Sequence, residues 1–306
     1  MTTPPILLDP AIGAALDAGA PVVALESTII THGMPWPDNL AMLERVESAV
    51  RDHGATPATI AVMDGTIRIG LSAAEARALA KTDGALKLSR ADLAFACAQG
   101  LTGGTTVAAT MMAAHGAGIA VFATGGIGGV HQGAETDFDI SADLDELART
   151  PVTVVSAGAK AILDIPKTLE ALETRGVPVI AVGQDEMPAF WSRGCGLDAP
   201  LRLDDADAIA RFLAIRAQLT DYRHGGVLVA NPVPTEAEIP HAEMAGFITQ
   251  AQAEAAERGI KGKHVTPWLL ARIVEITGSR SLATNIALVE NNARLGAEIA
   301  VALTGR

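Results

Sequence analysis

The chain contains the stretch Val152-Thr153-Val154-Val155, followed directly by Ser156-Ala157-Gly158-Ala159-Lys160. Successive apolar or β-branched residues predict a short strand covered on both faces rather than one with a solvent face. A lone lysine follows where this buried strand should end. A buried lysine there would be poorly solvated, which favours its neutral, nucleophilic amine. Such amines form Schiff bases with sugar carbonyls, although a lysine on a surface turn is the alternative interpretation.

Similar apolar runs recur along the chain and alternate with helical patterns. Further strands are expected at Pro21–Leu25, Thr59–Met63, Ile119–Ala123, Val177–Val182 and Gly226–Ala230. Helices are expected at Ala73–Ala80, Val107–His115, Glu243–Arg258, Pro267–Thr277 and Leu282–Leu303. Met63-Asp64-Gly65-Thr66 predicts a hairpin turn, so the sheet should be mixed. The pattern predicts an α/β fold of three layers, α/β/α, with a central mixed, mostly parallel sheet and a helical C-terminal third.

Composition narrows the classes of protein that fit. With 306 residues, 49% of them hydrophobic, the chain can bury one large core, and without a linker or repeat we expect a single domain over residues 1–306. A net charge of −12 argues against a nucleic-acid partner. The two cysteines, Cys97 and Cys195, support neither a disulfide framework nor a thiolate zinc site.

No targeting or membrane segment is expected either. The stretch from Gly100 to Val130 has hardly any charged side chains, but glycines interrupt it and leave no continuous apolar helix of about 20 residues. The N-terminal stretch lacks the basic region of a signal peptide. The sequence therefore predicts a cytoplasmic protein with no membrane partner.

Two glycine-rich motifs are candidate ligand sites. Gly103-Gly104-Thr105-Thr106 leads into a helical pattern, and free N–H groups at such a helix start suit a phosphate. Thr124-Gly125-Gly126-Ile127-Gly128-Gly129-Val130-His131 approximates a dinucleotide fingerprint, but the third glycine of G-x-G-x-x-G falls on His131. A glycine-lined wall that lets a ligand approach the backbone is the better interpretation.

Acidic residues supply the remaining candidates. In Phe138-Asp139-Ile140-Ser141-Ala142-Asp143, Ser141 is expected to cap the start of a helix and Asp143 to lie in its first turn. Asp139 precedes this helix and is not needed to cap it. Its carboxylate suits a hard divalent ion that keeps most of its waters. Glu26 ends another apolar strand, where an unpaired carboxylate is costly to ionise. It is therefore a candidate proton donor or half of a buried ion pair.

Taken together, these segments resemble the pseudouridine-5′-phosphate glycosidase family, also called the indigoidine-synthase-A-like family. The segments that carry the resemblance occur in one order along nearly the whole chain: Ala24–Pro35, Lys87–Arg90, Thr105–Ala108, Phe122–Gly129, Phe138–Asp143, Ser156–Lys160 and Val229–Pro232. Several unrelated motifs in one order are far more specific than any one of them.

The resemblance implies a metal-dependent enzyme of the carbon–oxygen lyase class that reversibly splits pseudouridine 5′-phosphate into uracil and ribose 5-phosphate. It implies Lys160 as the Schiff-base nucleophile, Glu26 as the proton donor and Asp139 as the Mn²⁺ ligand. It also implies a homotrimer. The implied substrate contacts are Lys87, the backbone of Val107, Ser141, Ala142, Asp143, Thr106, Thr124, His131 and Asn285.

One departure from the family concerns phosphate binding. The family often has His-Arg-Gly-Ala-Glu where this chain has His131-Gln132-Gly133-Ala134-Glu135, so a cation is missing at Gln132. Two other functions stay open. One is a Schiff-base aldolase acting on a sugar phosphate, which would release an aldehyde instead of uracil. The other is a non-catalytic regulator that binds a nucleotide or sugar phosphate.

Overall fold

The computed structural model describes residues 5–219, 225–260 and 265–305. Its strands are β1 (Ile6–Leu8), β2 (Val22–Leu25), β3 (Thr56–Met63), β4 (Thr66–Ile69), β5 (Leu86–Leu88), β6 (Gly103–Thr105), β7 (Val121–Ala123), β8 (Thr153–Ser156), β9 (Val179–Val182), β10 (Leu201–Leu203) and β11 (Val227–Ala230). Its helices are α1 (Pro10–Asp17), α2 (Asp38–Asp52), α3 (Ala73–Ala80), α4 (Leu93–Ala98), α5 (Val107–Gly116), α6 (Ala134–Asp137), α7 (Ala142–Arg149), α8 (Ile165–Thr174), α9 (Ala206–Gln218), α10 (His241–Glu257), α11 (Val265–Ile276) and α12 (Arg280–Thr304), with short turns η1 (Ile29–Gly33), η2 (Arg90–Asp92) and η4 (Thr235–Ala237). Every strand and helix expected from the sequence overlaps one of these elements.

Within the described residues, 11 strands form one sheet in the order β1-β4-β3-β2-β7-β8-β11-β9-β10, and β6 joins β5 to β3. Neighbouring strands from β3 to β10 in that order are all parallel. Strands β4 and β6 run antiparallel to β3. The sheet is therefore mixed and mostly parallel, as the sequence predicts.

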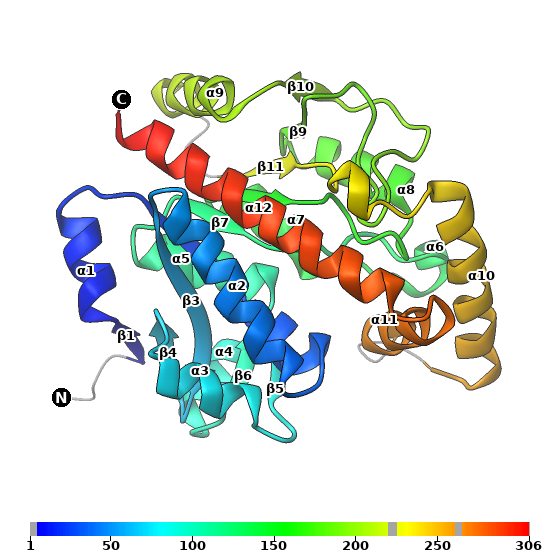
Figure 1. The fold of residues 1–306 in the computed structure, drawn as a ribbon, viewed down its shortest axis with the longest axis horizontal. Helices are drawn as coiled ribbons and strands as arrows, with labels where there is room; N and C mark the ends of the chain where they lie inside the picture. Colours follow the sequence, from blue (N-terminus) through cyan, green and yellow to red (C-terminus); the bar gives the residue numbers. More distant parts are fainter. Residues whose placement is uncertain (1–4, 220–224, 261–264, 306) are drawn as a thin grey trace.

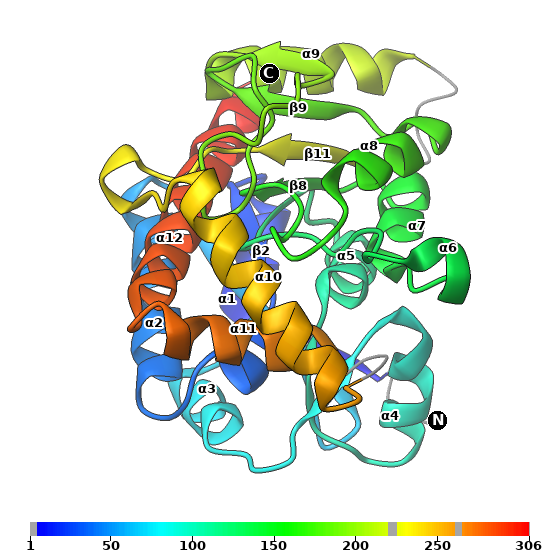
Figure 2. The same ribbon diagram turned by 90° about the vertical axis from the view of Figure 1, so that its right-hand side faces the viewer.

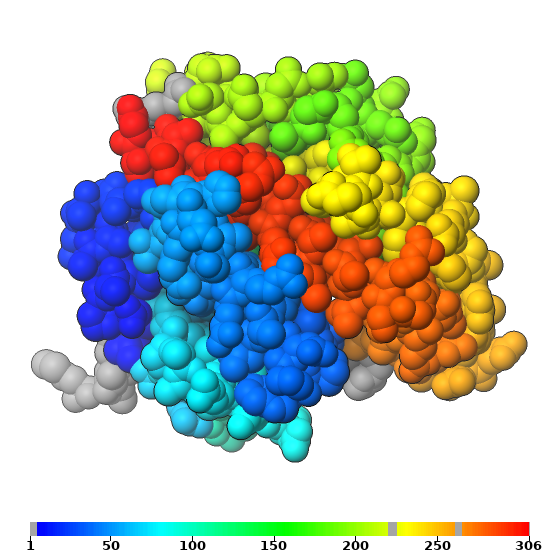
Figure 3. Space-filling model, viewed as in Figure 1, coloured from blue at the N-terminus to red at the C-terminus, as the bar shows by residue number. Residues whose placement is uncertain are grey.

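Helices cover both faces of this sheet (Figures 1 and 2). Helix α12 packs against α2, α9 and the strands β2, β7 and β8 on one face. Figure 3 shows α2 in blue and α12 in red lying side by side across that face. Helices α5, α7 and α8 cover the other face, and α10 and α11 pack on each other to one side. The α/β/α layering and the helical C-terminal third are confirmed.

The strands are buried because their side chains face a helical layer on each side. Ile60, Phe122, Val154 and Leu228, from four different strands, are fully buried. Continuous apolar runs are typical of such doubly covered strands. None of the helices in the described ranges combines the length and apolar character needed to cross a bilayer.

The predicted turn between β3 and β4 is confirmed. Asp64 and Gly65 both have positive φ angles, 48° and 74°, as a two-residue hairpin turn requires. The short strands β1, β5, β6 and β10 were not expected, because three residues give too little periodicity to recognise.

The helix start expected after Gly103-Gly104-Thr105-Thr106 is confirmed, because α5 begins at Val107. Gly103-Gly104-Thr105 forms strand β6 ahead of it, and phosphate binding at this helix start stays a prediction. A Cβ on Gly104 would lie 2.4 Å from Thr31 Oγ1 and 2.8 Å from the Ser27 carbonyl oxygen. Glycine is needed there because another part of the chain packs against the strand. Thr106 follows as the N-cap of α5, its hydroxyl accepting from the Ala109 N–H.

Candidate active site

Three polar side chains gather where central strands end. Glu26 follows β2, Thr124 follows β7, and Lys160 comes four residues after β8. The chain passes from β2 to its neighbour β3 on one side and later returns to β7 on the other. In open α/β sheets, ligands bind outside the carboxyl ends of the strands at such a switch in strand order. The topology therefore brings together residues far apart in the sequence.

Glu26 is held at both of its carboxylate oxygens. Thr124 Oγ1 donates to Oε1, and Thr28 Oγ1 donates to Oε2. The residue is only 9% exposed. Two hydroxyl donors therefore fix the direction of the carboxylate. Thr124, implied by the resemblance to contact substrate, is bonded to Glu26 in this structure.

Lys160 is positioned through its backbone. Its N–H donates to the Ile127 carbonyl over 3.1 Å, and Ile127 N–H donates to Gly158 O over 3.0 Å. These bonds continue the parallel pairing of β7 and β8 past the strand ends, with a bridge between Ile127 and Ala159. We expected a buried lysine here, but Lys160 is only half-buried. It lies past the covered part of the sheet, where a substrate can reach it.

Lys87, on β5, completes the cluster. Desolvation by the surrounding protein lowers the pKa of Lys87, and the charge on Lys160 lowers it further. The carboxylates of Glu26 and Asp143 oppose these effects. The Lys87 residue as a whole is nonetheless exposed. An amine that meets solvent on one side and protein on the others fits both facts.

Two histidines border this cluster. Burial lowers the pKa of His131, the carboxylates of Asp139 and Asp137 oppose the shift, and the charges on Lys87 and Lys160 reinforce it. Burial also lowers the pKa of His32, and Lys87 adds to the effect. Both imidazoles are therefore neutral near pH 7. Neutral imidazole carries one donor and one acceptor nitrogen, which suits hydrogen bonding to an uncharged group.

The glycine-lined wall after β7 is occupied by protein rather than open to a ligand. A Cβ on Gly126 would lie 2.7 Å from the Phe190 ring, and one on Gly128 would lie 2.3 Å from Ser141 Oγ. A Cβ on Gly129 would lie 2.4 Å from Thr168 Oγ1. This part of the sequence interpretation is wrong, because the glycines make room for neighbouring side chains.

Asp143 joins two backbone segments. Its carboxylate accepts from the Ala108 N–H over 2.9 Å and from the Gly128 N–H over 2.8 Å, and the residue is 6% exposed. It thus connects the first turn of α5 to the glycine run. Ser141 is the N-cap of α7, as expected, and accepts from the Asp143 N–H. Ala142 is exposed at the first position of α7.

The first turn of α5 has one N–H group left for a ligand. The Ala108 and Ala109 N–H groups are bonded to Asp143 and Thr106. The Val107 N–H has no protein acceptor in the part of the chain that the structure describes. A donor at the positive end of a helix suits an anionic or carbonyl oxygen.

Asp139 is the residue implied to bind Mn²⁺. It is half-buried, it lies close enough to His131 to affect that ring, and its backbone N–H donates to Asp137 Oδ1. Among the described residues, no group of three or more His, Cys, Asp or Glu side chains is placed to hold a metal ion. The donor set thus fits a hard ion held by one carboxylate and otherwise by water, and it does not fit a fully protein-coordinated ion.

Asn285 lies on α12 and accepts a 2.6 Å hydrogen bond from Trp191 Nε1.

Gln132 lines a cavity of about 360 Å³ between α10 and the segment after Lys160, and its Nε2 is 3.5 Å from the Leu163 carbonyl oxygen. That cavity is mostly apolar and contains neither Glu26 nor Lys160. We therefore place the candidate site at the polar cluster, where titratable side chains meet, and not in this cavity.

The sequence did not single out Thr28, His32 or Trp191. Thr28 and His32 stand within the motif Ala24–Pro35, so that motif could have drawn attention to them. Trp191 carries no comparable signal, because its role depends on a contact with a residue 94 positions away.

The fold and this cluster define an α/β enzyme with a lysine and a carboxylate at the carboxyl edge of a parallel sheet. The chain belongs to the family described as indigoidine synthase A like protein, whose model matches residues 11–302. A pseudouridine-5′-phosphate glycosidase of Mesorhizobium japonicum is 67% identical over 95% of each chain. A protein of the same name from Paracoccus denitrificans is 64% identical over 98% of this chain and 99% of its own.

Solved structures show the same fold. The prealnumycin C-glycosynthase AlnA, determined in complex with ribulose 5-phosphate, superimposes with a TM-score of 0.90 at 37% identity and covers 98% of this chain and 97% of its own. An indigoidine synthase A-like protein from Thermotoga maritima superimposes with a TM-score of 0.89 at 34% identity, with 99% of each chain covered.

Proposed function

We propose that this chain is a pseudouridine-5′-phosphate glycosidase that reversibly converts pseudouridine 5′-phosphate and water into uracil and ribose 5-phosphate. The observation that carries the proposal is the cluster of Lys160, Glu26 and Lys87 at the switch in strand order. The high identity to relatives of that name over nearly the whole chain supports it.

The bond to be broken explains why a lysine is needed. It joins sugar C1′ to uracil C5, so the leaving side has no heteroatom to protonate, unlike an ordinary glycosidic oxygen. In the proposed reaction, C1′–O4′ breaks, O4′ takes a proton, and Lys160 Nζ forms a bond to C1′. Uracil C5 then takes a proton as C1′–C5 breaks and the lysine nitrogen becomes an imine. Water hydrolyses the imine to free ribose 5-phosphate and the lysine.

Glu26 moves the protons in this scheme. Its carboxylate, oriented by Thr28 and Thr124, takes the proton that Lys160 loses on attack and delivers a proton to O4′ or C5. Lys87 and the Val107 N–H provide donors for the phosphate or sugar oxygens. Asn285 and His131 complete the pocket.

Asp139 would hold Mn²⁺ through one carboxylate, with water as its other ligands. When bound, the ion supplies positive charge beside the site for anionic oxygens of the substrate. The neighbouring His131 remains neutral and is free to hydrogen-bond. We also propose that residues 1–306 form one catalytic domain that assembles as a homotrimer, as the family resemblance implies; light scattering after gel filtration tests the assembly.

Trapping the imine tests the function and the nucleophile together. The protein is incubated with ribose 5-phosphate and Mn²⁺, reduced with borohydride, digested and analysed by mass spectrometry. The expected product is a reduced ribose 5-phosphate adduct on Lys160. Separately, pseudouridine 5′-phosphate should release uracil. Release of an aldehyde instead would indicate an aldolase, and an adduct on another lysine would overturn the assigned mechanism.

A further inference from the structure

Trp191 is a fully buried side chain whose one polar atom is engaged. Its ring meets Phe190 edge to face, with centroids 5.0 Å apart. Its Nε1–H donates to Asn285 Oδ1 over 2.6 Å and also lies 3.2 Å from the Ser281 carbonyl oxygen. Phe190 in turn packs against Gly126, two residues after Thr124. Trp191 therefore connects α12 to the segment that begins at the active site.

The indole N–H fixes which end of the Asn285 amide faces it. Indole nitrogen is a donor only, so it accepts no bond from an amide NH₂ group. Asn285 must therefore turn Oδ1 toward Trp191 and Nδ2 away from it. Within the described residues Nδ2 has no protein acceptor, and it is not among the polar atoms sealed from solvent. Two N–H donors consequently face open space.

The position of α12 places that space at the carboxyl edge of the sheet. Asn292 Nδ2, on the same helix, donates to the Thr124 carbonyl over 2.8 Å. Asn285 lies two turns earlier on the same face, about 10 Å along the axis. In Figure 1, α12 begins beside α10 and α11, on the side toward which β11 points. Gly296 lies against Ala123 within β7 and Asn292 against Thr124 just after it, so going back along α12 to Asn285 leads past the carboxyl end of β7.

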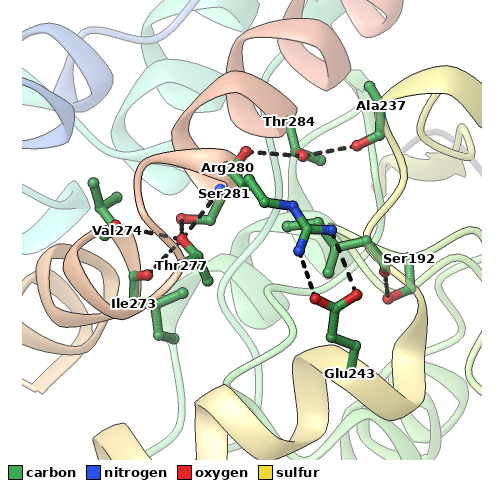
Figure 4. Close-up of polar contacts among 10 residues, drawn as sticks. Ser192, Ala237, Glu243, Ile273, Val274, Thr277, Arg280, Ser281 and Thr284 are labelled. Carbon is green, nitrogen blue, oxygen red and sulfur yellow. Dashed lines mark hydrogen bonds and ion pairs between the residues drawn. The ribbon is translucent and has the colours of Figure 1, made fainter.

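Hydrogen bonds hold this end of α12 in place. Arg280 forms an ion pair with Glu243 of α10 over 2.5 Å, and Thr284 Oγ1 donates to Ala237 O over 2.7 Å (Figure 4). Thr277 Oγ1 donates to Ser281 Oγ over 3.0 Å in the same network. The turn that carries Asn285 is therefore held in place by contacts on both sides.

We propose that Trp191 is a positioning residue for base recognition. By holding Asn285 Oδ1, it turns Asn285 Nδ2 toward the site, where Nδ2 donates to a carbonyl oxygen of the pyrimidine. A base with an acceptor at that position is favoured over one with an amino group there. The inference rests on the proposed function and assigns to it a residue that does not itself touch substrate.

Kinetics in the synthetic direction test the inference, because uracil and ribose 5-phosphate can be varied separately. Trp191→Phe keeps the ring but removes the donor, so KM for uracil should rise about tenfold. KM for ribose 5-phosphate should stay within about twofold. Asn285→Asp keeps the acceptor for Trp191 but loses both donors, so KM for uracil should rise further. Trp268→Phe on α11 and Asn291→Asp on α12 are matched controls.

A double-mutant comparison separates positioning from general packing. In the Asn285→Ala background, Trp191→Phe should change KM for uracil by less than about twofold. Equal increases in both KM values, or an unchanged uracil KM in Trp191→Phe and Asn285→Asp, would overturn the inference while leaving the proposed function intact. A wild-type protein that releases no uracil would overturn both. If Trp191→Phe does not fold, Asn285→Asp alone decides.

Discussion

The two residues proposed to react, Glu26 and Lys160, are held differently from the segment between His131 and Ile140. Glu26 and Lys160 are fixed by hydroxyl and backbone hydrogen bonds at strand ends. Between His131 and Ile140, by contrast, Phe138 is 80% exposed and has a left-handed φ of 58°, and Asp139 is half-buried. Glu26 and Lys160, proposed for the covalent chemistry, are positioned in advance by protein contacts. Asp139, proposed to bind the metal, still has a carboxylate that can bond to a ligand.

Asp139 and Asp143, four residues apart, show the same contrast. Asp143 has both oxygens bonded to backbone N–H groups and is nearly inaccessible. The Asp139 carboxylate has no hydrogen-bond partner among the described residues. A carboxylate that the protein saturates stabilises the fold, and one that it leaves open can bind an ion.

The largest expected effect is at Lys160. Lys160→Ala should lower kcat by about 10³-fold or more, because removing a covalent nucleophile leaves only the remaining binding groups. Lys167→Ala is the control, since Lys167 is an exposed lysine paired with Glu135 and Asp164. Uracil release is the measurement. If kcat of Lys160→Ala lies within tenfold of the wild-type value, Lys160 is not the nucleophile.

Glu26→Gln should lower kcat by about 10²- to 10⁴-fold, the usual range for a lost proton-transfer group. Thr28→Val should cost about tenfold, because it removes one of the two hydroxyls that orient the carboxylate. Thr28→Ser keeps the hydroxyl and should recover most of the activity. If Thr28→Val matches the wild type across the pH profile, the hydroxyl has no positioning role.

Replacing Asp143 should lower the free energy of unfolding more than replacing Asp139. Asp143→Asn places an amide nitrogen against a backbone N–H and should lower the free energy of unfolding by about 1–3 kcal/mol. Asp139→Asn should change it by less than about 0.5 kcal/mol. Urea unfolding of both variants without metal measures this difference. Equal losses would mean that Asp139 also stabilises the fold.

Titration of His131 by NMR tests whether the Asp139 carboxylate lies close to the imidazole. The midpoint should lie below 6.5, and Asp139→Asn should lower it further by removing a charge that favours the imidazolium. Because the folded-state pKa is below the unfolded one, the unfolded chain binds more protons between the two values. This histidine's contribution to stability therefore falls as the pH drops from about 6.5 toward the folded-state pKa.

The same resonances report on the metal. Mn²⁺ is paramagnetic, so an ion at Asp139 should broaden the His131 signals, and Asp139→Asn should require about tenfold more Mn²⁺ for the same broadening. The His115 signals serve as a control, because that residue lies at the far end of α5. Broadening that is unchanged in Asp139→Asn would place the ion elsewhere.

The smallest expected effect is at Gln132. Gln132→Arg supplies the cation often found in the family and should lower KM for pseudouridine 5′-phosphate several-fold, about 1 kcal/mol, with little change in kcat. The effect should shrink as salt rises, since screening weakens exposed pairs. A flat KM at low salt would show that position 132 serves the cavity beneath α10 rather than the phosphate.

Much of the fold could be predicted from local pattern. The central strands are continuous apolar runs, and the β3–β4 turn and the capping box of α3, formed by Ser72 and Glu75, have distinct local signatures. Strand β6 could not be predicted, because Gly103-Gly104-Thr105 has no side-chain periodicity. The glycines there are required by the approach of Thr31 and Ser27, which only the folded chain reveals.

The sequence by itself singled out the candidates for the chemistry, since Glu26, Asp139 and Lys160 each stand in a motif with a recognisable local context. The tertiary structure alone decided their partners: Thr28 and Thr124 on Glu26, Asp143 between two backbone segments, and Trp191 on Asn285. The physical reason is that side-chain identity is local, whereas hydrogen-bond geometry depends on strand order and helix packing. These contacts join residues up to 98 positions apart, and no local pattern records such a separation.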